Sequence, residues 1–258
     1  MNLLITGSNG FVGNYFINKY KNKYTIKTFS FLKEDINCLD CIDIDTVFHL
    51  SALVHQMGGA TKEEYEKVNV TQTLELATKA KASGVKHFVF MSTVKVYGEE
   101  TNNTYTENTI CNPEDEYGKS KLKAEKLLLE LEDDDFKVSI IRTPIVYGYG
   151  VKANIKALVK LTSKVPLLPF GKIENKRSMV YIGNLCHLVD EIIEQKQSGI
   201  FLAGDEPLST SKLIELISEN LDKKIYLIKI PFFEALLKLI KPSFHKRLYG
   251  SLEVDNTI

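Results

Sequence analysis

The sequence predicts an α/β protein with a doubly wound parallel sheet and a smaller C-terminal lobe. Over the first 150 residues, apolar strand-like runs alternate with amphipathic helix-like segments. Such alternation is typical of βαβ units and of a parallel sheet covered by helices on both faces. After about residue 150 the pattern changes, because prolines at positions 166, 169, 207, 231 and 242 break it into shorter pieces. The 258 residues suit one domain, or one large lobe and a small one.

The elements are expected in the following order. Short apolar runs predict strands at 3–6, 24–30, 46–50, 86–92 and 137–142, and amphipathic segments predict helices at about 11–20, 61–83 and 117–132. Gly84 follows the second of these helices and ends it. Residues 31–45 are polar and irregular, which predicts a shortened crossover, and residues 99–116 form a long polar loop of the kind often kept for function. A further helix at 181–195 and a strand at 199–203 return to the main sheet.

The first thirteen residues carry glycines at positions 7, 10 and 13, between the first strand and the first helix. In a dinucleotide-binding unit, these glycines allow a sharp turn, a close approach of backbone to pyrophosphate, and close packing of helix on sheet. The helix N-terminus then offers free N–H groups to the phosphates. A glycine-rich surface turn is the alternative, but the position after a strand favours phosphate binding.

These observations divide the chain into two parts. Residues 1–150, with about 181–204, are predicted to form a dinucleotide-binding domain of the Rossmann type. Residues of about 151–180 and 205–258 are predicted to form a smaller substrate-binding lobe. Ligands of such sheets lie at the carboxyl ends of the strands, so the lobe would close over them there.

Composition restricts the classes of partner. The formal net charge is zero, which gives no electrostatic reason to expect nucleic acid or an anionic membrane surface as a partner. Met1 leads directly into the first strand, so we expect no signal peptide, and no apolar run is long enough for a membrane span. Cys38 and Cys41 form a CxxC without a second pair or a nearby histidine. We therefore expect no metal site, and reduced thiols in a cytoplasmic protein.

Residues 232–240 are apolar and flanked by lysines. A peripheral membrane helix is one interpretation of this segment. A helix packed in the small lobe is the favoured one, because the segment is short and one-faced.

Tyr117 and Lys121 are the candidates for acid–base chemistry. They stand four residues apart on a predicted helix and therefore on one face. Bringing a tyrosine pKa from near 10 to about 7 requires roughly 4 kcal/mol of preferential phenolate stabilisation, which a nearby ammonium and a cationic ring can supply. The spacing alone is weak, since Tyr15 and Lys19 repeat it. The strand end at Ser92 and Thr93 and the long loop before the helix favour Tyr117.

At this point the chain resembles the extended short-chain dehydrogenase/reductases of the NAD-dependent epimerase/dehydratase family, whose members act on nucleotide sugars. The resemblance covers nearly the whole chain in the family's order. It rests on Thr6-Gly7-Ser8-Asn9-Gly10-Phe11-Val12-Gly13, Asp35-Ile36, His49-Leu50-Ser51-Ala52, Val68-Asn69-Val70, Ser92-Thr93, Val96-Tyr97-Gly98, Tyr117-Gly118-Lys119-Ser120-Lys121, Arg142-Thr143-Pro144, Val146-Tyr147-Gly148, Arg177 and Tyr181-Ile182.

The resemblance implies roles for individual residues. Tyr117 would be the catalytic acid/base, Lys121 would hold the ribose and lower the tyrosine pKa, and Thr93 would orient the sugar oxygen. Asn154 and Arg177, with Thr93 and Tyr117, would bind the substrate; a solvated surface arginine is the alternative for Arg177, and a polar helix-face residue is the alternative for Asn69. The cofactor would be bound by Tyr117, Lys121, Gly7, Gly10, Phe11, Val12, Gly13, Ser30, Asp35, Ile36, Leu50, Ser51, Ala52, Asn69, Ser92 and Pro144.

Departures from the family pattern narrow the function. Val94 and Lys95 stand where the dehydratases carry an Asp-Glu pair, so dehydration is rejected. Ser30, with Lys33 nearby, stands where an acid usually grips the ribose of NAD, so either NAD or NADP is expected. The prediction is hydride transfer at C4 of a UDP-hexose or UDP-N-acetylhexosamine in surface-polysaccharide synthesis, by a 4-epimerase or a 4-keto reductase. A non-catalytic NAD(P)-binding regulator or scaffold is the alternative.

By the same resemblance, the predicted helices at 61–83 and 117–132 would pair with those of a second copy, so a homodimer is expected.

Overall fold

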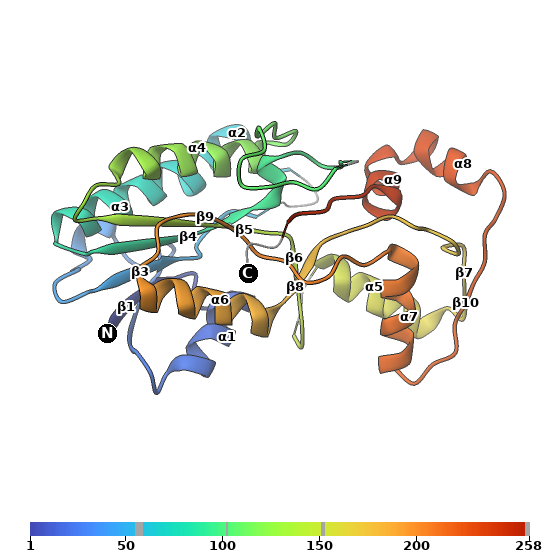
Figure 1. The fold of residues 1–258 in the computed structure, drawn as a ribbon, viewed down its shortest axis with the longest axis horizontal. Helices are drawn as coiled ribbons and strands as arrows, with labels where there is room; N and C mark the ends of the chain where they lie inside the picture. Colours follow the sequence, from blue (N-terminus) through green and yellow to red (C-terminus); the bar gives the residue numbers. More distant parts are fainter. Residues whose placement is uncertain (55–58, 102, 151–152, 256–258) are drawn as a thin grey trace.

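The computed structural model describes residues 1–54, 59–101, 103–150 and 153–255, and it confirms the predicted fold class. Among these residues the central sheet has six parallel strands in the order β2-β1-β3-β4-β5-β9 (Figure 1). They are β1 (Asn2–Thr6), β2 (Thr25–Phe29), β3 (Thr46–His49), β4 (His87–Thr93), β5 (Lys137–Thr143) and β9 (Gly199–Leu202). The strand order reverses at β1. Ligands of doubly wound sheets bind at such a reversal, outside the carboxyl ends of the strands.

Helices cover both faces of this sheet, because successive strand residues point to opposite sides. Leu3 and Ile5 of β1 face α1 (Phe11–Tyr20) and α6 (Ile182–Gln195), where they join one apolar cluster. Leu4 faces the other side and packs with α3 (Gln72–Ala82) and α4 (Glu116–Leu131). Figure 1 shows the two layers, with α3 and α4 above the sheet and α1 and α6 below it.

The helix predicted at 61–83 is one helical run with a wider turn in its middle. Thr61 begins α2 (Lys62–Tyr65) with a capping box that it shares with Glu64. The next segment, η2 (Glu66–Thr71), is π-helical and leads into α3. A π-turn shifts the face that each following side chain presents, and such turns are frequent at functional sites. Asn69, a predicted cofactor residue, lies in this turn and is fully buried.

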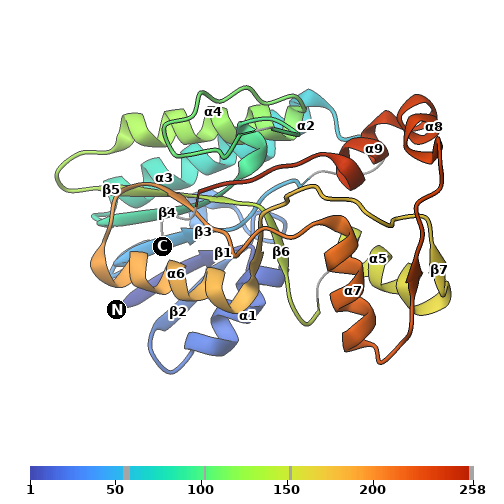
Figure 2. The same cartoon turned by 45° about the vertical axis from the view of Figure 1, so that its right-hand side comes forward.

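Most of the chain after β5, apart from α6 and β9, builds the smaller lobe, which lies on the right in Figure 1 and comes forward in Figure 2. Its own apolar cluster centres on Leu168, Phe170, Ile173, Ile214 and Leu248. The elements are β6 (Ile145–Tyr147) paired with β8 (Met179–Tyr181), β7 (Leu167–Leu168) paired with β10 (Tyr226–Leu227), α5 (Ala153–Lys164), α7 (Thr210–Asn220), α8 (Phe233–Ile240) and α9 (Pro242–Tyr249).

The last described residues return from this lobe to the sheet. Leu252 and Val254 pack with Val94 and Val96, which follow β4, and single β-bridges join Leu252 to Arg177 and Val254 to Tyr105. The C-terminal segment therefore ties the loop at 99–116 to the small lobe. Within the described part of the chain, no helix is long and apolar enough to cross a bilayer.

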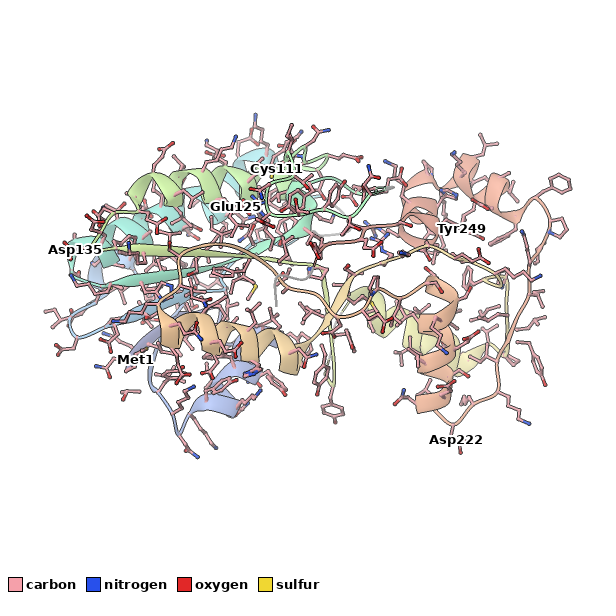
Figure 3. The ribbon with its side chains drawn as sticks, in the orientation of Figure 1. Met1, Cys111, Glu125, Asp135, Asp222 and Tyr249 are labelled. Atoms are coloured by element: carbon pink, nitrogen blue, oxygen red, sulfur yellow. The ribbon has the colours of Figure 1, made fainter. Side chains whose placement is uncertain are left out.

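A buried ion pair fixes α4 against the sheet. The Arg142 guanidinium of β5 contacts the Glu125 carboxylate of α4, with 2.6 Å between Nη2 and Oε2, and both side chains are almost fully buried. The Ser92 hydroxyl donates to the same carboxylate, and Arg142 Nη1 donates to the Tyr97 hydroxyl at 2.6 Å. Burial acts to lower the pKa of Arg142, but the hydrogen bonds and charge of Glu125 outweigh it and hold the pKa above its ordinary value. Figure 3 labels Glu125 beneath α4.

We expect Glu125→Gln to lower the free energy of unfolding by about 3–5 kcal/mol, because it leaves the Arg142 charge buried without a counter-ion. The measurement is urea unfolding followed by circular dichroism. Glu66→Gln is the matched control, since Glu66 pairs with Lys123 of the same helix at the protein surface and should contribute about 0–1 kcal/mol. Equal costs for the two substitutions would contradict the structural role assigned to Glu125.

Candidate active site

The glycine turn after β1 has the geometry that dinucleotide binding requires. Gly7 has φ +67°, and a Cβ there would lie 2.8 Å from the backbone of Leu50 and Ser51. A Cβ on Gly13 would lie 2.6 Å from the Gly7 carbonyl oxygen, so only glycine lets α1 begin this close to the strand. Side chains at these two positions would push β1, α1 and the end of β3 apart.

The start of α1 is suited to bind phosphate. Gly10 is its N-cap and offers no side chain to the first-turn N–H groups, and this turn carries no acidic residue. Phe11 and Val12 follow as the first two helical residues and are partly buried. The turn therefore leaves backbone N–H donors and the positive end of the helix dipole at the carboxyl edge of the sheet. These residues fit a dinucleotide cofactor.

The three predicted catalytic residues meet at the carboxyl end of β4. Thr93 is the last residue of β4, and Tyr117 lies in the first turn of α4 with Lys121 one turn further on. The Thr93 side chain lies near enough to the Tyr117 phenol to act on its pKa. Asp115 caps the helix by accepting from the Gly118 N–H at 2.7 Å, which fixes where the helix that carries Tyr117 begins.

The surroundings of Tyr117 keep its phenol protonated. Burial raises the pKa of Tyr117, and the charges of Asp115 and Tyr65 raise it further, whereas the Thr93 side chain acts to lower it. We expected Lys121 to lower the tyrosine pKa, but burial and Asp115 outweigh every lowering influence in the protein alone. The charge that would stabilise a phenolate must therefore arrive with bound ligands.

Lys121 is buried beside aromatic rings. Its side chain is 1% exposed, and Nζ lies 3.7 Å from the centre of the Phe90 ring. Burial lowers the pKa of Lys121 to about 7, although the charge of Glu125 acts to raise it. A lysine that is half-charged at neutral pH in a closed site is typical of functional positions.

A continuous chain of hydrogen bonds connects the glycine turn to the catalytic helix. Thr6, next to Gly7, contacts His49 Nδ1 at 2.6 Å, and His49 Nε2 contacts the Thr73 hydroxyl at 2.9 Å. Thr73 donates to the carbonyl of Asn69 at 2.9 Å, so it must accept from His49, which assigns the proton to Nε2. Burial lowers the pKa of His49 to about 3, and Lys121 lowers it too, so the ring is neutral, as this assignment requires.

Asn69 completes this chain. Its amide accepts from the Leu53 N–H at 2.8 Å and donates to the Leu53 carbonyl and to the Ser120 hydroxyl, both at 3.0 Å. Ser120 donates in turn to the carbonyl of Tyr117 at 2.8 Å. Asn69 is therefore not a polar residue on an exposed helix face; it joins the loop after β3 to the helix that carries Tyr117. Sequence reasoning placed Asn69 at the site but missed the contributions of His49 and Glu125.

The remaining predicted cofactor residues border the same edge of the sheet. The Leu50 and Ser51 N–H groups contact the Thr6 hydroxyl, each at 3.2 Å, and Ala52 follows them along the loop after β3. Ser92 precedes Thr93 in β4, and the Ser92 carbonyl accepts from the Thr143 hydroxyl at 3.0 Å. Pro144 comes directly after β5.

The end of β2 carries an acid that sequence reasoning missed. The chain turns at residues 30–34, and the Glu34 carboxylate accepts from the Ser30 N–H at 3.0 Å. An acidic group therefore stands at the end of β2, although no acid follows the strand directly. Asp35 caps a short 3₁₀ segment, η1 (Ile36–Cys38), by accepting from the Asn37 N–H, and thus places Ile36 at its start.

Arg177 is held by the C-terminal end of α9. Its Nη1 donates to the carbonyls of Lys246 and Gly250 at 3.2 and 3.1 Å, so it is not a solvated surface arginine. Burial lowers the pKa of Arg177; the charge of Glu99 acts to raise it and that of Arg247 to lower it. The charge of Glu100 also acts to raise this pKa. Asn154 falls in the first turn of α5, and its side chain is outside the described residues.

Two other sequence features have structural explanations. Lys95, at a dehydratase position, forms ion pairs with Glu99 and Asp115, both at 2.6 Å, and so supports the N-terminus of α4. The second Tyr/Lys pair lies on α1, where Lys19 contacts the Gly183 carbonyl of α6 at 3.4 Å.

Cys38 is exposed and Cys41 buried, and the described residues contain no group of three histidine, cysteine or acidic side chains that could hold a metal ion.

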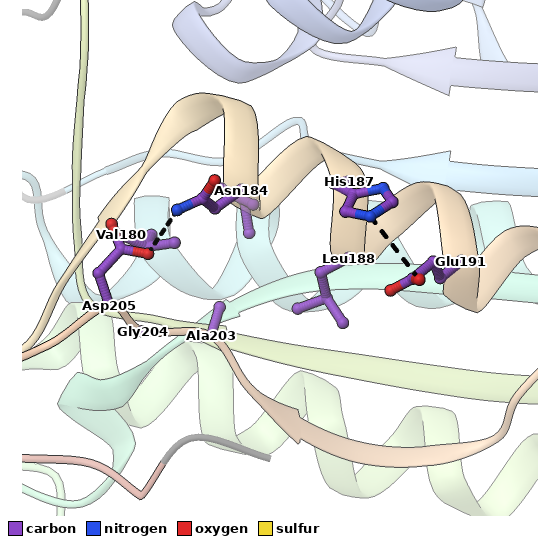
Figure 4. A pocket seen from close by; sticks show the side chains of 9 residues that line it. Val180, Asn184, His187, Leu188, Glu191, Ala203, Gly204 and Asp205 are labelled. Atoms are coloured by element: carbon purple, nitrogen blue, oxygen red, sulfur yellow. Dashed lines mark hydrogen bonds and ion pairs between the residues drawn. The ribbon is translucent and has the colours of Figure 1, made fainter. Parts of the chain in front are cut away.

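A pocket of about 250 Å³ opens beside α6, away from this cluster (Figure 4). Asn184 donates to Asp205 at 2.8 Å, and Asp205 also accepts from the Tyr147 hydroxyl and the Tyr181 N–H. Asp205 thus holds β6, β8 and the start of α6 together. The pocket shares no residue with the predicted site. The hydrogen bonds of Asp205 account for Asp205 and Asn184 in its lining without a ligand.

Comparison with known proteins agrees with this geometry. A family model described as "NAD dependent epimerase/dehydratase family" matches residues 3–204. A UDP-glucose 4-epimerase of Vibrio cholerae is 37% identical, over 98% of this chain and 87% of that protein. An N-acetyl-α-D-glucosaminyl-diphospho-ditrans,octacis-undecaprenol 4-epimerase of Escherichia coli O157:H7 is 28% identical, over 90% of this chain and 76% of that protein.

Among solved structures, the UDP-N-acetylglucosamine 4-epimerase of Methanobrevibacter ruminantium in complex with UDP-N-acetylmuramic acid superimposes with a TM-score of 0.79. That alignment has 22% identity and covers 99% of this chain and 89% of the other. At this identity the likeness shows the fold.

The depressed Lys121 pKa predicts a pH dependence of stability in the protein without ligands. Between about pH 7, the folded pKa, and the ordinary lysine value, the unfolded chain binds more protons than the folded one, so stability rises with pH. We expect this residue to contribute up to about 1.4 kcal/mol per pH unit. The measurement is urea unfolding from neutral to alkaline pH, with Lys121→Met as the comparison. Identical slopes for the two proteins would contradict the buried, half-charged lysine.

Proposed function

The chain belongs to the NAD dependent epimerase/dehydratase family, and from this premise we propose that it is an NAD-dependent 4-epimerase of a UDP-hexose or UDP-N-acetylhexosamine. The observation that carries the proposal is the meeting of Thr93, Tyr117 and Lys121 at the end of β4, next to the glycine turn. A hydroxyl, a phenol and an amine at this position can accept the proton of a sugar hydroxyl and donate it back. Surface-polysaccharide synthesis is the process proposed for its product.

Each residue of the site has a part in proton transfer. The glycine turn and the first turn of α1 would hold a bound NAD, which would supply the acceptor and donor of the hydride at C4 of the sugar. Tyr117 takes the proton of the sugar hydroxyl at its phenol oxygen and gives it back, and Thr93 donates to or accepts from the same sugar oxygen. Lys121, one helical turn from Tyr117, would hold the ribose, and the cationic ring of the bound cofactor would add the charge that stabilises the Tyr117 phenolate. Asn69 and Glu125 hold α4 in position for these steps.

NAD is the proposed cofactor, because of Glu34. Its carboxylate stands at the Ser30 N–H, where it can accept a hydrogen bond from a ribose 2′-hydroxyl and repel a 2′-phosphate. The sequence alone left both NAD and NADP open, and the apparent lack of an acid after the second strand favoured a reductase that consumes NADPH. An acid at this position supports a tightly held NAD that is regenerated in each turnover, as epimerisation requires.

The diphosphate of the substrate is assigned to Arg177. The carbonyls of Lys246 and Gly250 fix its guanidinium through Nη1, and a planar guanidinium suits bidentate phosphate binding. The E. coli relative acts, by its name, on a sugar diphosphate carried by undecaprenol. Such a substrate presents the same diphosphate, so other residues of the small lobe would have to recognise the group that is attached to it.

Assembly and location follow from other features. We propose a homodimer in which the outer faces of α3 and α4 pair with those of a second copy, since these two helices lie side by side on one face of the sheet. All four cysteines are free, which supports the reducing cytoplasm as the location.

The catalytic proposal predicts activity without added cofactor. Purified protein mixed with UDP-N-acetylglucosamine or UDP-glucose should form the 4-epimer over many turnovers. Chromatography of the nucleotide sugars measures the product. Tyr117→Phe should lower kcat by about 10²–10⁴, because it removes the group that carries the proton. Tyr105→Phe, a tyrosine stacked on Tyr97 in the loop at 99–116, is the control. A full rate in Tyr117→Phe would assign the fold to a non-catalytic NAD-binding protein, and a strict need for NADPH would assign a reductase.

The cofactor proposal predicts the effect of Glu34→Gln. This substitution keeps an acceptor for the Ser30 N–H but removes the charge, so the preference for NAD over NADP should fall by about tenfold. The measurement is the Kd of each dinucleotide by calorimetry on protein stripped of bound nucleotide. Glu75→Gln, on the exposed face of α3, should leave both Kd values unchanged. An unchanged ratio in Glu34→Gln would remove Glu34 from cofactor recognition.

A further inference from the structure

The far end of the small lobe exposes bulky apolar side chains. Phe232, which precedes α8, is 88% exposed; Leu239 of α8 is 83% exposed, and Leu236 and Ile240 of this helix are also exposed. Phe244 of α9 is exposed next to them. Scattered apolar residues are normal at a protein surface, but a contiguous set marks a site of interaction.

The helical geometry explains why α8 cannot bury these residues in its own lobe. Phe233 and Leu237 lie on one side of the helix and pack against the lobe core. Leu236, Leu239 and Ile240 are spaced three and four apart, so they share a different face, which points away from that core. The apolar arc of α8 is therefore wider than the lobe covers: one side packs in the lobe, as the favoured interpretation expects, and the other side faces outward.

The apolar surface continues into the connection before the helix. Tyr226, Ile228, Ile230 and Phe232 alternate along an extended segment, and all four are exposed. Phe232 has φ +62°, a backbone conformation that bulky residues rarely adopt. Figures 1 and 2 show this connection and α8 along the edge of the molecule farthest from the central sheet.

The charge around this face is positive, although the whole chain is neutral. Between Lys223 and Gly250 the sequence has seven lysines and arginines and one acidic residue, Glu234, which faces His245 at 3.3 Å. Lys229, Lys238 and Lys241 are exposed and make no ion pair with any other residue that the structure describes. These three lysines stand directly beside the exposed apolar residues in the chain.

From this combination we propose that Ile230, Phe232, Leu236, Leu239, Ile240 and Phe244, here called the α8 face, dock on an anionic phospholipid bilayer. An amphipathic helix with lysines at its border lies in the plane of such a surface, with the apolar residues below the headgroups and the ammonium groups among the phosphates. A two-fold contact with a second copy would set the lysines of one copy against those of the other. An anionic bilayer can bury the apolar residues and also pair the lysines with phosphate groups.

The chain offers a direct probe of this contact, because it contains no tryptophan. Phe232→Trp should shift its fluorescence to the blue when phosphatidylcholine vesicles that contain phosphatidylglycerol are added, and the shift should be lost at high salt. Ile42→Trp is the matched control; Ile42 is 68% exposed but lies in the crossover before β3, and its fluorescence should not move. The absence of any shift for Phe232→Trp would overturn the proposal.

Co-sedimentation with the same vesicles gives the second test. Leu236→Ser and Leu239→Ser should each lower the partition coefficient by about tenfold or more, and Lys238→Gln and Lys241→Gln by about fivefold each. Ile42→Ser should leave it unchanged. Turnover of UDP-sugar in solution should stay at the wild-type rate in all five variants, so failure of docking and failure of the catalytic proposal are distinguishable. Leucine variants that keep vesicle binding but halve the mass in light scattering would assign the α8 face to a second copy instead.

Discussion

The buried contact between Glu125 and Arg142 is the constraint on which the catalytic arrangement depends. Glu125 lies one helical turn beyond Lys121 and two beyond Tyr117, so all three share the face of α4 that meets the sheet. Arg142 and Ser92 bind Glu125 from β5 and β4, and Thr93 is the next residue of β4. The pair thus fixes the distance between Thr93 and Tyr117. Its hydrogen bonds to Ser92 and Tyr97 satisfy charges that would otherwise make burial unfavourable.

A second network serves the cofactor side in the same way. Thr6, His49 and Asn69 connect the glycine turn, β3 and the π-turn of η2 to the helix that carries Tyr117. The neutral state of His49 matters here, because a neutral ring can accept on one side and donate on the other, whereas a charged one can only donate. The nearby positive charge of Lys121 favours this neutral state, so one buried cation contributes to both the electrostatics and the order of the site.

The parts that could be predicted from sequence are those that local chemistry determines. Glycines at 7 and 13 are required by backbone contacts within one turn, and Tyr117 and Lys121 share a face because they stand four apart on a helix. Other features depend on where the chain returns. Glu34 reaches the end of β2 only because residues 30–34 form a turn, and Arg177 is held by carbonyls some seventy residues further on. The Tyr117 pKa depends on burial, which no spacing reveals.

The small lobe joins two surfaces through one pair of helices. α8 and α9 are consecutive and pack against each other, and α9 carries Arg247 and the carbonyls that hold Arg177. A surface that binds the outer face of α8 would therefore act on the pair of helices that holds Arg177, the residue proposed to bind the diphosphate. Gly250 then leads into Leu252 and Val254, which pack behind β4 close to Thr93. If both proposals hold, contacts at the far edge of the lobe would orient the substrate phosphates relative to Tyr117 without any change in the sheet, because the C-terminal segment connects the two parts directly.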